Sequence, residues 1–251
     1  MPFAEAGGQT LTEHRGQTPA EPRRQTLGLL GLTVALALVL TSTIGAATAR
    51  RVTFRTEDGV TLNAAFYDPS RQPAPGIVLL PMHRRSHVDW EPAASQLADA
   101  GFAVLAIDFR SSEELTPLAA DVRAAKAFLR GRPEVTGTSI GLAGASIGAN
   151  LALLDAADDP GVQSVALLSP GLDYRGLRTE AAMKKFGARA ALLVGSTKDP
   201  YARRSIVQLA TIGPGTRIVR LSETLGHGTT LLMRDQELAG ALVDWFRRTL
   251  Q

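Results

Sequence analysis

Residues 139–150 read SIGLAGASIGAN, and this stretch decides the fold. Its apolar run, Ile140 to Ala143, predicts a short buried strand. The residues that follow, Ile147 to Ala157, are rich in alanine and leucine and predict a helix. Between the two lies a Gly-x-Ser-x-Gly motif centred on Ser146. Glycine, alanine and serine also gather in ordinary turns, so the motif gains its weight from its position between a strand and a helix.

A serine in a sharp strand-to-helix turn holds a strained backbone conformation and exposes its hydroxyl. The residues two before and two after it, Gly144 and Gly148, must be small, since otherwise the helix could not pack so near the strand. The helix that follows directs backbone N–H groups and the positive end of its dipole toward whatever the serine attacks. Ser146 is therefore the predicted nucleophile.

The rest of the chain alternates short apolar runs with helical segments, a rhythm typical of a parallel sheet covered on both faces. We expect an α/β domain with a mostly parallel twisted sheet, an N-terminal antiparallel hairpin and no large lid. The expected strands are 52–56, 60–67, 77–80, 103–107, 140–143, 164–168, 190–194 and 217–221. The expected helices are 91–100, 117–130, 147–157, 202–211 and 234–249, with room for one more short helix between 169 and 190.

Composition excludes several classes of function. At 251 residues and 45% hydrophobic content, the chain is long enough for one large α/β domain. It has no cysteine, which excludes disulfides, thiolate metal sites and a cysteine nucleophile. A net charge of +3 with scattered Lys and Arg gives no specific support for nucleic-acid binding. We therefore expect no cofactor, no metal and no nucleic-acid partner.

The N-terminal region divides into two parts by composition. Residues 1–22 are rich in Gly, Gln, Thr, Pro and charge, and we expect them to be disordered. Residues 23–49 begin with two arginines, continue with an uncharged apolar stretch and end in small residues, a pattern typical of a secretory signal. The same stretch is long enough to cross a bilayer as a retained anchor. We expect an exported protein that is periplasmic, extracellular or anchored by residues 23–49, with residues 50–251 forming the folded domain.

A serine hydroxyl needs a base within hydrogen-bond reach, and that base needs a carboxylate to orient it. His227 lies between the last expected strand and the last helix, where flanking glycines let a loop carry the imidazole over the sheet edge. The plain alternative is an exposed loop histidine with no role. Asp199 directly follows an expected strand and is the leading carboxylate, although Asp-Pro also favours a helix N-cap. Asp173, after the preceding strand, is the reserve.

The chain order Ser146, Asp199, His227 is the order expected of α/β-hydrolases. Over residues 52–249 the chain resembles α/β-hydrolases of the dienelactone hydrolase type, and this resemblance implies an α/β-hydrolase fold with a serine nucleophile. Besides the three residues above, it is carried by His83, Asp89-Trp90, Leu97, Gly101-Phe102 and Asp108-Phe109-Arg110.

An oxyanion hole needs two donors. One is expected from the backbone N–H of Ile147, and the other from the loop 81–86, where the resemblance assigns it to the N–H of Arg84. Dienelactone hydrolase itself uses a cysteine at the position of Ser146, so its substrate does not transfer. Arg84 stands where a glycine is common in the family, and Ala145 replaces a residue that is often larger, which should open the pocket slightly.

Three further residues are expected to bind substrate. His83 and Arg85 lie in the loop that should border the site. Arg84 and Arg85 either favour an acidic substrate group or are simply solvated. Tyr174 either lines the site or packs against the core.

Two classes of function follow from these observations. The first is a serine hydrolase of the carboxylesterase type, which cleaves small or open-site esters through an acyl-enzyme; a thioesterase, lactonase or peptidase is a variant of it. The second is a catalytically inactive α/β-hydrolase fold that serves as a binding module at the cell envelope. All three triad positions are filled, which favours the enzyme. The expected partner is a small-molecule ester, with membrane contact only through residues 23–49 if they are retained.

Overall fold

The computed structural model describes residues 48–112 and 114–251. The predictions for residues 1–22, and for nearly all of residues 23–49, concern positions outside these ranges. Among the helices that the structure describes, none is long and apolar enough to span a bilayer.

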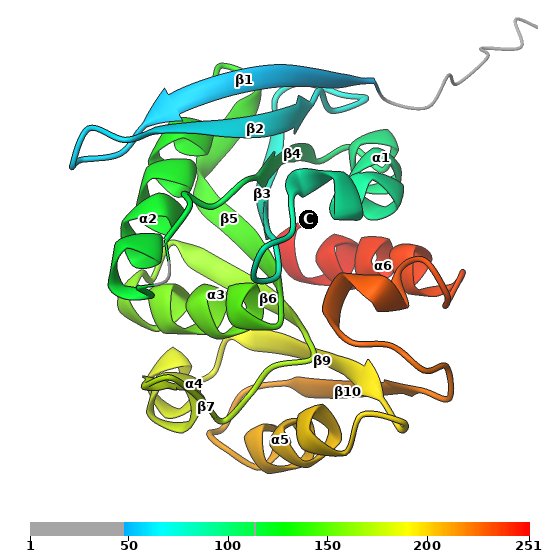
Figure 1. The fold of residues 1–251 in the computed structure, drawn as a ribbon. Coiled ribbons are helices and arrows are strands. Elements are labelled where there is room, and N and C mark those ends of the chain that lie inside the picture. The colour runs from blue at the N-terminus through cyan, green and yellow to red at the C-terminus, as the bar shows by residue number, and fades with distance from the viewer. Residues whose placement is uncertain (1–47, 113) are drawn as a thin grey trace, which may run out of the picture. The chain divides into compact units, whose positions relative to one another are not determined.

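A mixed sheet forms the centre of the fold, and its strands run in the order β1-β2-β4-β3-β5-β6-β9-β10 (Figure 1). The pairs β1–β2 and β2–β4 are antiparallel, and the other neighbouring strands are parallel. This is the predicted architecture, including its N-terminal hairpin. The strands are β1 (Ala49–Arg55), β2 (Thr61–Tyr67), β3 (Ala74–Leu80), β4 (Ala103–Ile107), β5 (Val135–Ala145), β6 (Val162–Leu168), β9 (Ala190–Ser196) and β10 (Arg217–Ser222), with a small separate hairpin of β7 (Asp173–Tyr174) and β8 (Leu177–Arg178).

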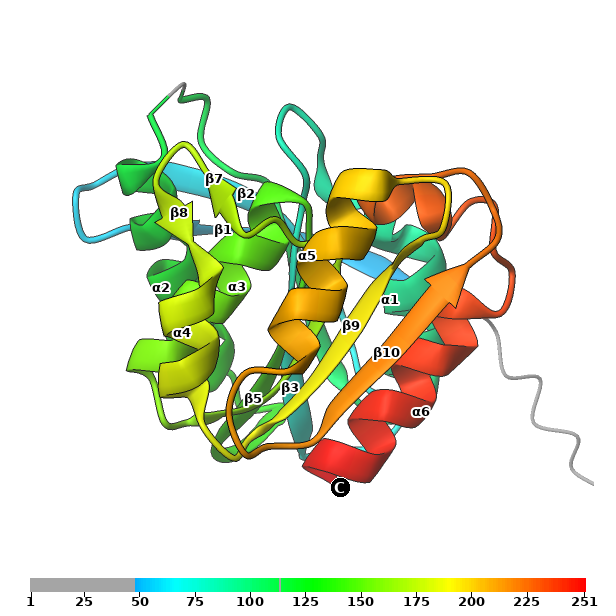
Figure 2. The same ribbon diagram turned by 90° about the horizontal axis from the view of Figure 1, so that it is seen from below.

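Helices cover both faces of the sheet (Figure 2). One face carries α2 (Thr116–Arg130), α3 (Ile147–Asp158), α4 (Thr179–Phe186) and α5 (Pro200–Ala210). The other carries α1 (Glu91–Asp99) and α6 (Leu238–Leu250). Two short 3-10 helices, η1 (His87–Trp90) and η2 (Gly228–Leu231), lie in loops.

The alternation of side chains along each strand explains why both faces need a cover. In β3, Val78 and Leu80 belong to the apolar cluster under α2 and α3, while Ile77 and Leu79 belong to the cluster under α1 and α6. All four side chains are fully buried. A strand buried on both faces is apolar at every position, which is why the sequence shows continuous runs here.

All the predicted strands and helices are present, with shifted ends. The last helix begins at Leu238 rather than at residue 234, because residues 228–231 form η2 and the N–H of Asp235 bonds to the carbonyl of Leu231. The third strand begins at Ala74, three residues before its predicted start at residue 77. The hairpin β7–β8 and the two 3-10 helices were not predicted, because elements this short leave no hydrophobic period.

The topology brings several loops to one edge of the sheet. From β3 the chain moves outward to β4, whereas from β5 it moves the opposite way to β6. The carboxyl ends of β3 and β5 therefore flank the point where strand order reverses, which is where ligands bind in open α/β sheets. Ser146 follows β5, and the loop with Arg84 follows β3.

Candidate active site

Ser146 lies at the junction of β5 and α3 with φ 53° and ψ −117°. Residues other than glycine rarely adopt a positive φ. The N–H of Ser146 donates to the Leu168 carbonyl at 2.8 Å, which holds the turn against β6. A Cβ atom on Gly144 would lie 2.1 Å from the carbonyl oxygen of Gly148, and one on Gly148 would lie 2.5 Å from the carbonyl oxygen of Pro81. The predicted need for small residues thus follows from direct backbone contacts.

The structure brings the three residues of the predicted triad together. The Nε2 atom of His227 lies 2.8 Å from the Ser146 hydroxyl oxygen, and its Nδ1 atom lies 2.5 Å from Oδ2 of Asp199. The His227 side chain is 44% exposed and that of Asp199 is 17% exposed. A proton can therefore pass between Ser146 and an imidazole that substrate can reach, while the carboxylate is held in a more enclosed position.

Asp199 combines the two roles that the sequence left as alternatives. It is the N-cap of α5, where its Oδ1 accepts the Ala202 N–H at 3.1 Å. Its other oxygen accepts the hydrogen bond from His227. Since capping orients the carboxylate and leaves Oδ2 available, the N-cap function and the contact with histidine support one another.

Asp173, the reserve carboxylate, is bonded elsewhere. It lies in β7, and its side chain is 47% exposed. One oxygen accepts the Gly176 N–H at 2.8 Å, and the other accepts Nε of Arg178 at 3.1 Å. It therefore stabilises the β7–β8 turn, and Asp199 is the carboxylate bonded to His227.

The two expected oxyanion donors lie on opposite sides of the strand-order reversal. Ile147 is the first residue of α3, and the first N–H groups of a helix have no acceptor within the helix. Arg84 lies in a turn closed by a 3.2 Å hydrogen bond from the Arg85 N–H to the Met82 carbonyl. Its φ is 56°, a conformation that favours glycine. This explains why glycine suits this position and why an arginine here carries backbone strain.

A cavity of about 250 Å³ lies beside Ile147. It is lined by residues 82–85 and 109–112 together with Leu118 and Ile147. His83 and Arg85, two of the expected substrate-binding residues, are part of this lining. The cavity therefore borders both expected oxyanion donors.

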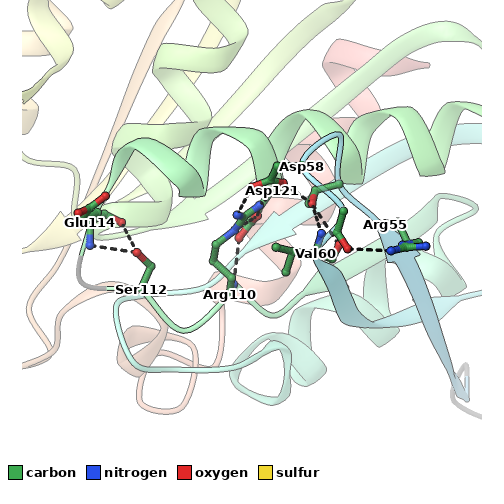
Figure 3. A network of polar contacts seen from close by, with 9 residues as sticks. Arg55, Asp58, Val60, Arg110, Ser112, Glu114 and Asp121 are labelled. Carbon is green, nitrogen blue, oxygen red and sulfur yellow. Dashed lines mark hydrogen bonds and ion pairs between the residues drawn. The ribbon is translucent and has the colours of Figure 1, made fainter.

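Two arginines of the cavity wall are already paired with carboxylates. Arg85 forms a two-point ion pair with Asp89, with both distances at 2.7 Å. Arg110 bonds Asp121 through Nε at 2.7 Å and Asp58 through its terminal nitrogens at 2.5 and 3.0 Å (Figure 3). The hydrogen bonds from Arg110 and Thr56 hold the pKa of Asp58 well below its ordinary value. Arg85 is thus bound to Asp89 while its side chain stays 46% exposed, and its preference for an acidic substrate group stays a prediction.

Tyr174 lies in β7 and packs, half-buried, against the apolar cluster on the α3 side. The guanidinium of Arg175 lies 5.7 Å from the centre of its ring. Tyr174 is not among the residues that line the cavity beside Ile147. Its contact with substrate stays a prediction.

Within residues 48–112 and 114–251, no group of three or more His, Cys, Asp or Glu side chains is placed to hold a metal ion.

The residues that hold the His227 loop are not indicated by the sequence. The Ser169 hydroxyl accepts the Gly228 N–H at 2.9 Å, and the Thr229 hydroxyl donates to Asp89 at 2.9 Å. Ser169 directly follows β6 at the carboxyl edge and has a φ of 51°. Its position after a predicted strand was the one signal that could have identified it.

Comparison with known proteins identifies the fold. The sequence matches no protein-family model and no curated protein. Among solved structures, it is similar to dienelactone hydrolase from Anabaena variabilis, with 19% identity, a TM-score of 0.71, and 82% of this chain and 100% of that one covered. It is also similar to the Pyrococcus furiosus esterase Pf2001 (16% identity, TM-score 0.68, 82% and 94% covered) and to an esterase domain of a Rhodothermus marinus protein (19%, 0.68, 81% and 100%).

These similarities, together with the sheet order, show that the chain has the α/β-hydrolase fold. Because the sequence identities are low, these similarities show the fold alone. The chemistry has to be inferred from the residues of the site itself.

Proposed function

We propose that this protein is a serine hydrolase that cleaves ester bonds. The observation that carries the proposal is the continuous hydrogen-bonded series from Ser146 through His227 to Asp199, with the serine in a strained strand-to-helix turn. A nucleophile within reach of a base, and a base oriented by a third group, is the arrangement that nucleophilic catalysis requires.

The proposed reaction has two halves. The Ser146 hydroxyl oxygen attacks the ester carbonyl while Nε2 of His227 accepts its proton, and Asp199 stabilises the imidazolium through Nδ1–H. The N–H groups of Ile147 and Arg84 donate to the oxyanion. As the tetrahedral intermediate collapses, the C–O bond to the alcohol breaks and His227 returns its proton to the leaving oxygen. Water then attacks the acyl-enzyme with His227 as base, which releases the acid and restores Ser146.

The surroundings favour small esters. Between β6 and β9 the structure holds only the β7–β8 hairpin and the short helix α4, with no separate cap domain. The cavity of about 250 Å³ beside Ile147 is near the lower end of the volumes of ligand pockets. Thioesters and lactones react by the same steps and are variants of the proposal. A peptidase is a weaker variant, because no second domain encloses the site within the part of the chain that the structure describes.

A second candidate is a binding module of the same fold without activity. Its support is the fold alone, because similar folds serve many functions. We also propose that the protein acts outside the cytoplasm, on the basis of the composition of residues 23–49. Fractionation of cells that express the full chain, with N-terminal sequencing of the product, tests the location and the cleavage together.

A fluorophosphonate probe separates the enzyme from the binding module. We expect the wild type to be labelled at Ser146 and Ser146→Ala to stay unlabelled. A panel of short- to long-chain p-nitrophenyl esters and simple lactones, assayed on the same two proteins, then identifies the preferred acyl length. Absence of labelling in the wild type, or equal labelling of Ser146→Ala, would remove the hydrolase proposal.

A further inference from the structure

The loop that carries His227 is held by hydrogen bonds within the loop and by bonds to two other parts of the chain. Within the loop, the His227 N–H donates to the Thr230 hydroxyl at 2.8 Å, and that hydroxyl donates back to the His227 carbonyl. The Gly228 N–H donates to Ser169 after β6. Thr229, which is 1% exposed, donates to Asp89 of η1 at 2.9 Å. The contact between Thr229 and Asp89 joins segments that are 140 residues apart in the sequence.

Asp89 continues this connection to the loop after β3. Its two carboxylate oxygens both accept from Arg85, which is the residue after the expected oxyanion donor Arg84. The same Oδ2 atom that accepts from Arg85 accepts from Thr229. One carboxylate, 12% exposed, therefore links the loop expected to bind the oxyanion to the loop that carries the base.

These two loops also pack directly against each other. Gly228 has a φ of 56°, and a Cβ atom there would lie 2.2 Å from the sulfur of Met82, which lies in the same loop after β3. The two loops thus contact each other at Gly228 and Met82. The Asp89–Thr229 hydrogen bond, which is directional, also constrains how one loop is oriented against the other. Because Arg85 neutralises the Asp89 charge at short range, the link acts on geometry rather than on the charge of the imidazole.

We propose that Asp89, acting through Thr229, is a positioning residue that sets His227 and the Arg84 loop in register across Ser146. The inference rests on the proposed function. A displacement of about 1 Å at reacting atoms can cost on the order of 100-fold in rate, so a link of this kind affects turnover more than binding.

The test uses Thr229→Val, which keeps the shape of the side chain, removes its hydroxyl and leaves Asp89 bonded to Arg85. We expect kcat to fall by about 10- to 100-fold with KM nearly unchanged. Thr229→Ser should restore the wild-type kcat, because it restores the donor. Asp89→Ala also breaks the pair with Arg85, so it should lose at least as much as Thr229→Val. The double variant should lose no more than Asp89→Ala, as expected for residues that act through one contact.

Thr249→Val is the matched control. The Thr249 hydroxyl also donates to a side chain of another element, Ser164, at 2.8 Å, but it lies at the end of α6 beside the start of β6. Thr249→Val should lower Tm about as much as Thr229→Val and leave kcat unchanged. The proposal is overturned if Thr229→Val leaves kcat unchanged, or if Thr249→Val lowers it equally.

A readout without turnover keeps this inference separate from the proposed function. The Nδ1 proton shared by His227 and Asp199 should give a downfield proton resonance in the wild type, lost or broadened in Thr229→Val and kept in Thr249→Val. If the wild type hydrolyses no ester and yet shows this pattern, the hydrolase proposal fails and the positioning role stands. If the enzyme is active and the resonance is identical in all three proteins, the positioning role fails alone.

Discussion

Two regions of this molecule place a basic side chain between groups from distant segments, and they do so in opposite ways. At the candidate site, His227 lies between Ser146 and Asp199, with one hydrogen bond to each and a side chain that is 44% exposed. At the wall of the cavity, Arg110 lies between Asp58 and Asp121 with a side chain that is only 10% exposed (Figure 3). The first basic group is accessible, whereas the hydrogen bonds to Asp58 and Asp121 raise the pKa of the second above its ordinary value.

Backbone strain follows the same division. Among the described residues, the non-glycine residues with positive φ are Arg84, Ser146, Ser169 and Arg175, and the first three directly support the site. Such conformations cost on the order of 1–3 kcal/mol each and persist only where the surrounding structure holds them. The ion-pair network of Arg110 contains none of them. The candidate site therefore holds its side chains in place at a cost to the free energy of unfolding, whereas the ion pairs of Arg110 stabilise the fold.

The largest expected effect is the loss of activity without loss of stability. Ser146→Ala and His227→Ala should each lower kcat by up to about 10⁶-fold, and the double variant should be little worse than either one, because the two side chains act as a unit. Tm should stay close to that of the wild type, because the hydrogen bond of the Ser146 hydroxyl is to the partly exposed side chain of His227. Ester turnover and thermal unfolding measure the two quantities. Multiplicative losses in the double variant would contradict the shared role.

The next effect distinguishes the two aspartates. Asp199→Asn should lower kcat by about 10⁴-fold, because an amide no longer favours the tautomer that presents Nε2 as a base. Its remaining oxygen can still cap α5 at Ala202, so Tm should change little. Asp173→Asn, the matched control in the β7–β8 turn, should keep the wild-type kcat. A greater loss in Asp173→Asn than in Asp199→Asn would show that the wrong carboxylate has been assigned.

At the Arg110 network we expect the opposite pattern, a loss of stability rather than a loss of activity. Arg110→Met leaves the fully buried Asp121 without its cation, and breaking a buried pair on one side costs about 3–5 kcal/mol of the free energy of unfolding. Arg110→Met/Asp121→Asn removes the uncompensated charge and should recover part of that loss. Denaturant unfolding measures both. Equal stability of the single and the double variant would contradict the cost assigned to leaving the buried Asp121 side chain without Arg110.

The smallest effect is a pH dependence at the exposed end of the same network. Because Arg110 and Thr56 lower the pKa of Asp58 on folding, its stabilising contribution is present above the unfolded value of about 3.9 and is lost as the pH falls below it. Asp58→Asn removes the contribution at neutral pH and should flatten the decline of stability between about pH 5 and pH 3. Thermal unfolding measured across this range in both proteins tests it. Parallel curves would show that Asp58 contributes nothing through its charge.

Much of the site could be predicted from local sequence because each residue follows a recognisable strand. Ser146, Asp199 and His227 come directly after apolar runs, and the carboxyl ends of parallel strands meet at one edge. The residues that could not be predicted act through contacts across the chain. Nothing near Asp89 in the sequence indicates Thr229, and nothing near Arg110 indicates Asp58 or Asp121, because no period or motif encodes a hydrogen bond between distant segments.

The sequence by itself determined the α/β class, the strand-to-helix turn around Ser146 and the chain order of the candidate residues Ser146, Asp199 and His227. It could do so because hydrophobic periods and the small residues at 144 and 148 are local requirements of the backbone. Only the tertiary structure decided which aspartate reaches His227, which arginines are neutralised at the cavity, and how Asp89 joins the two loops. These outcomes depend on distances between side chains that the chain brings together only after the sheet has formed.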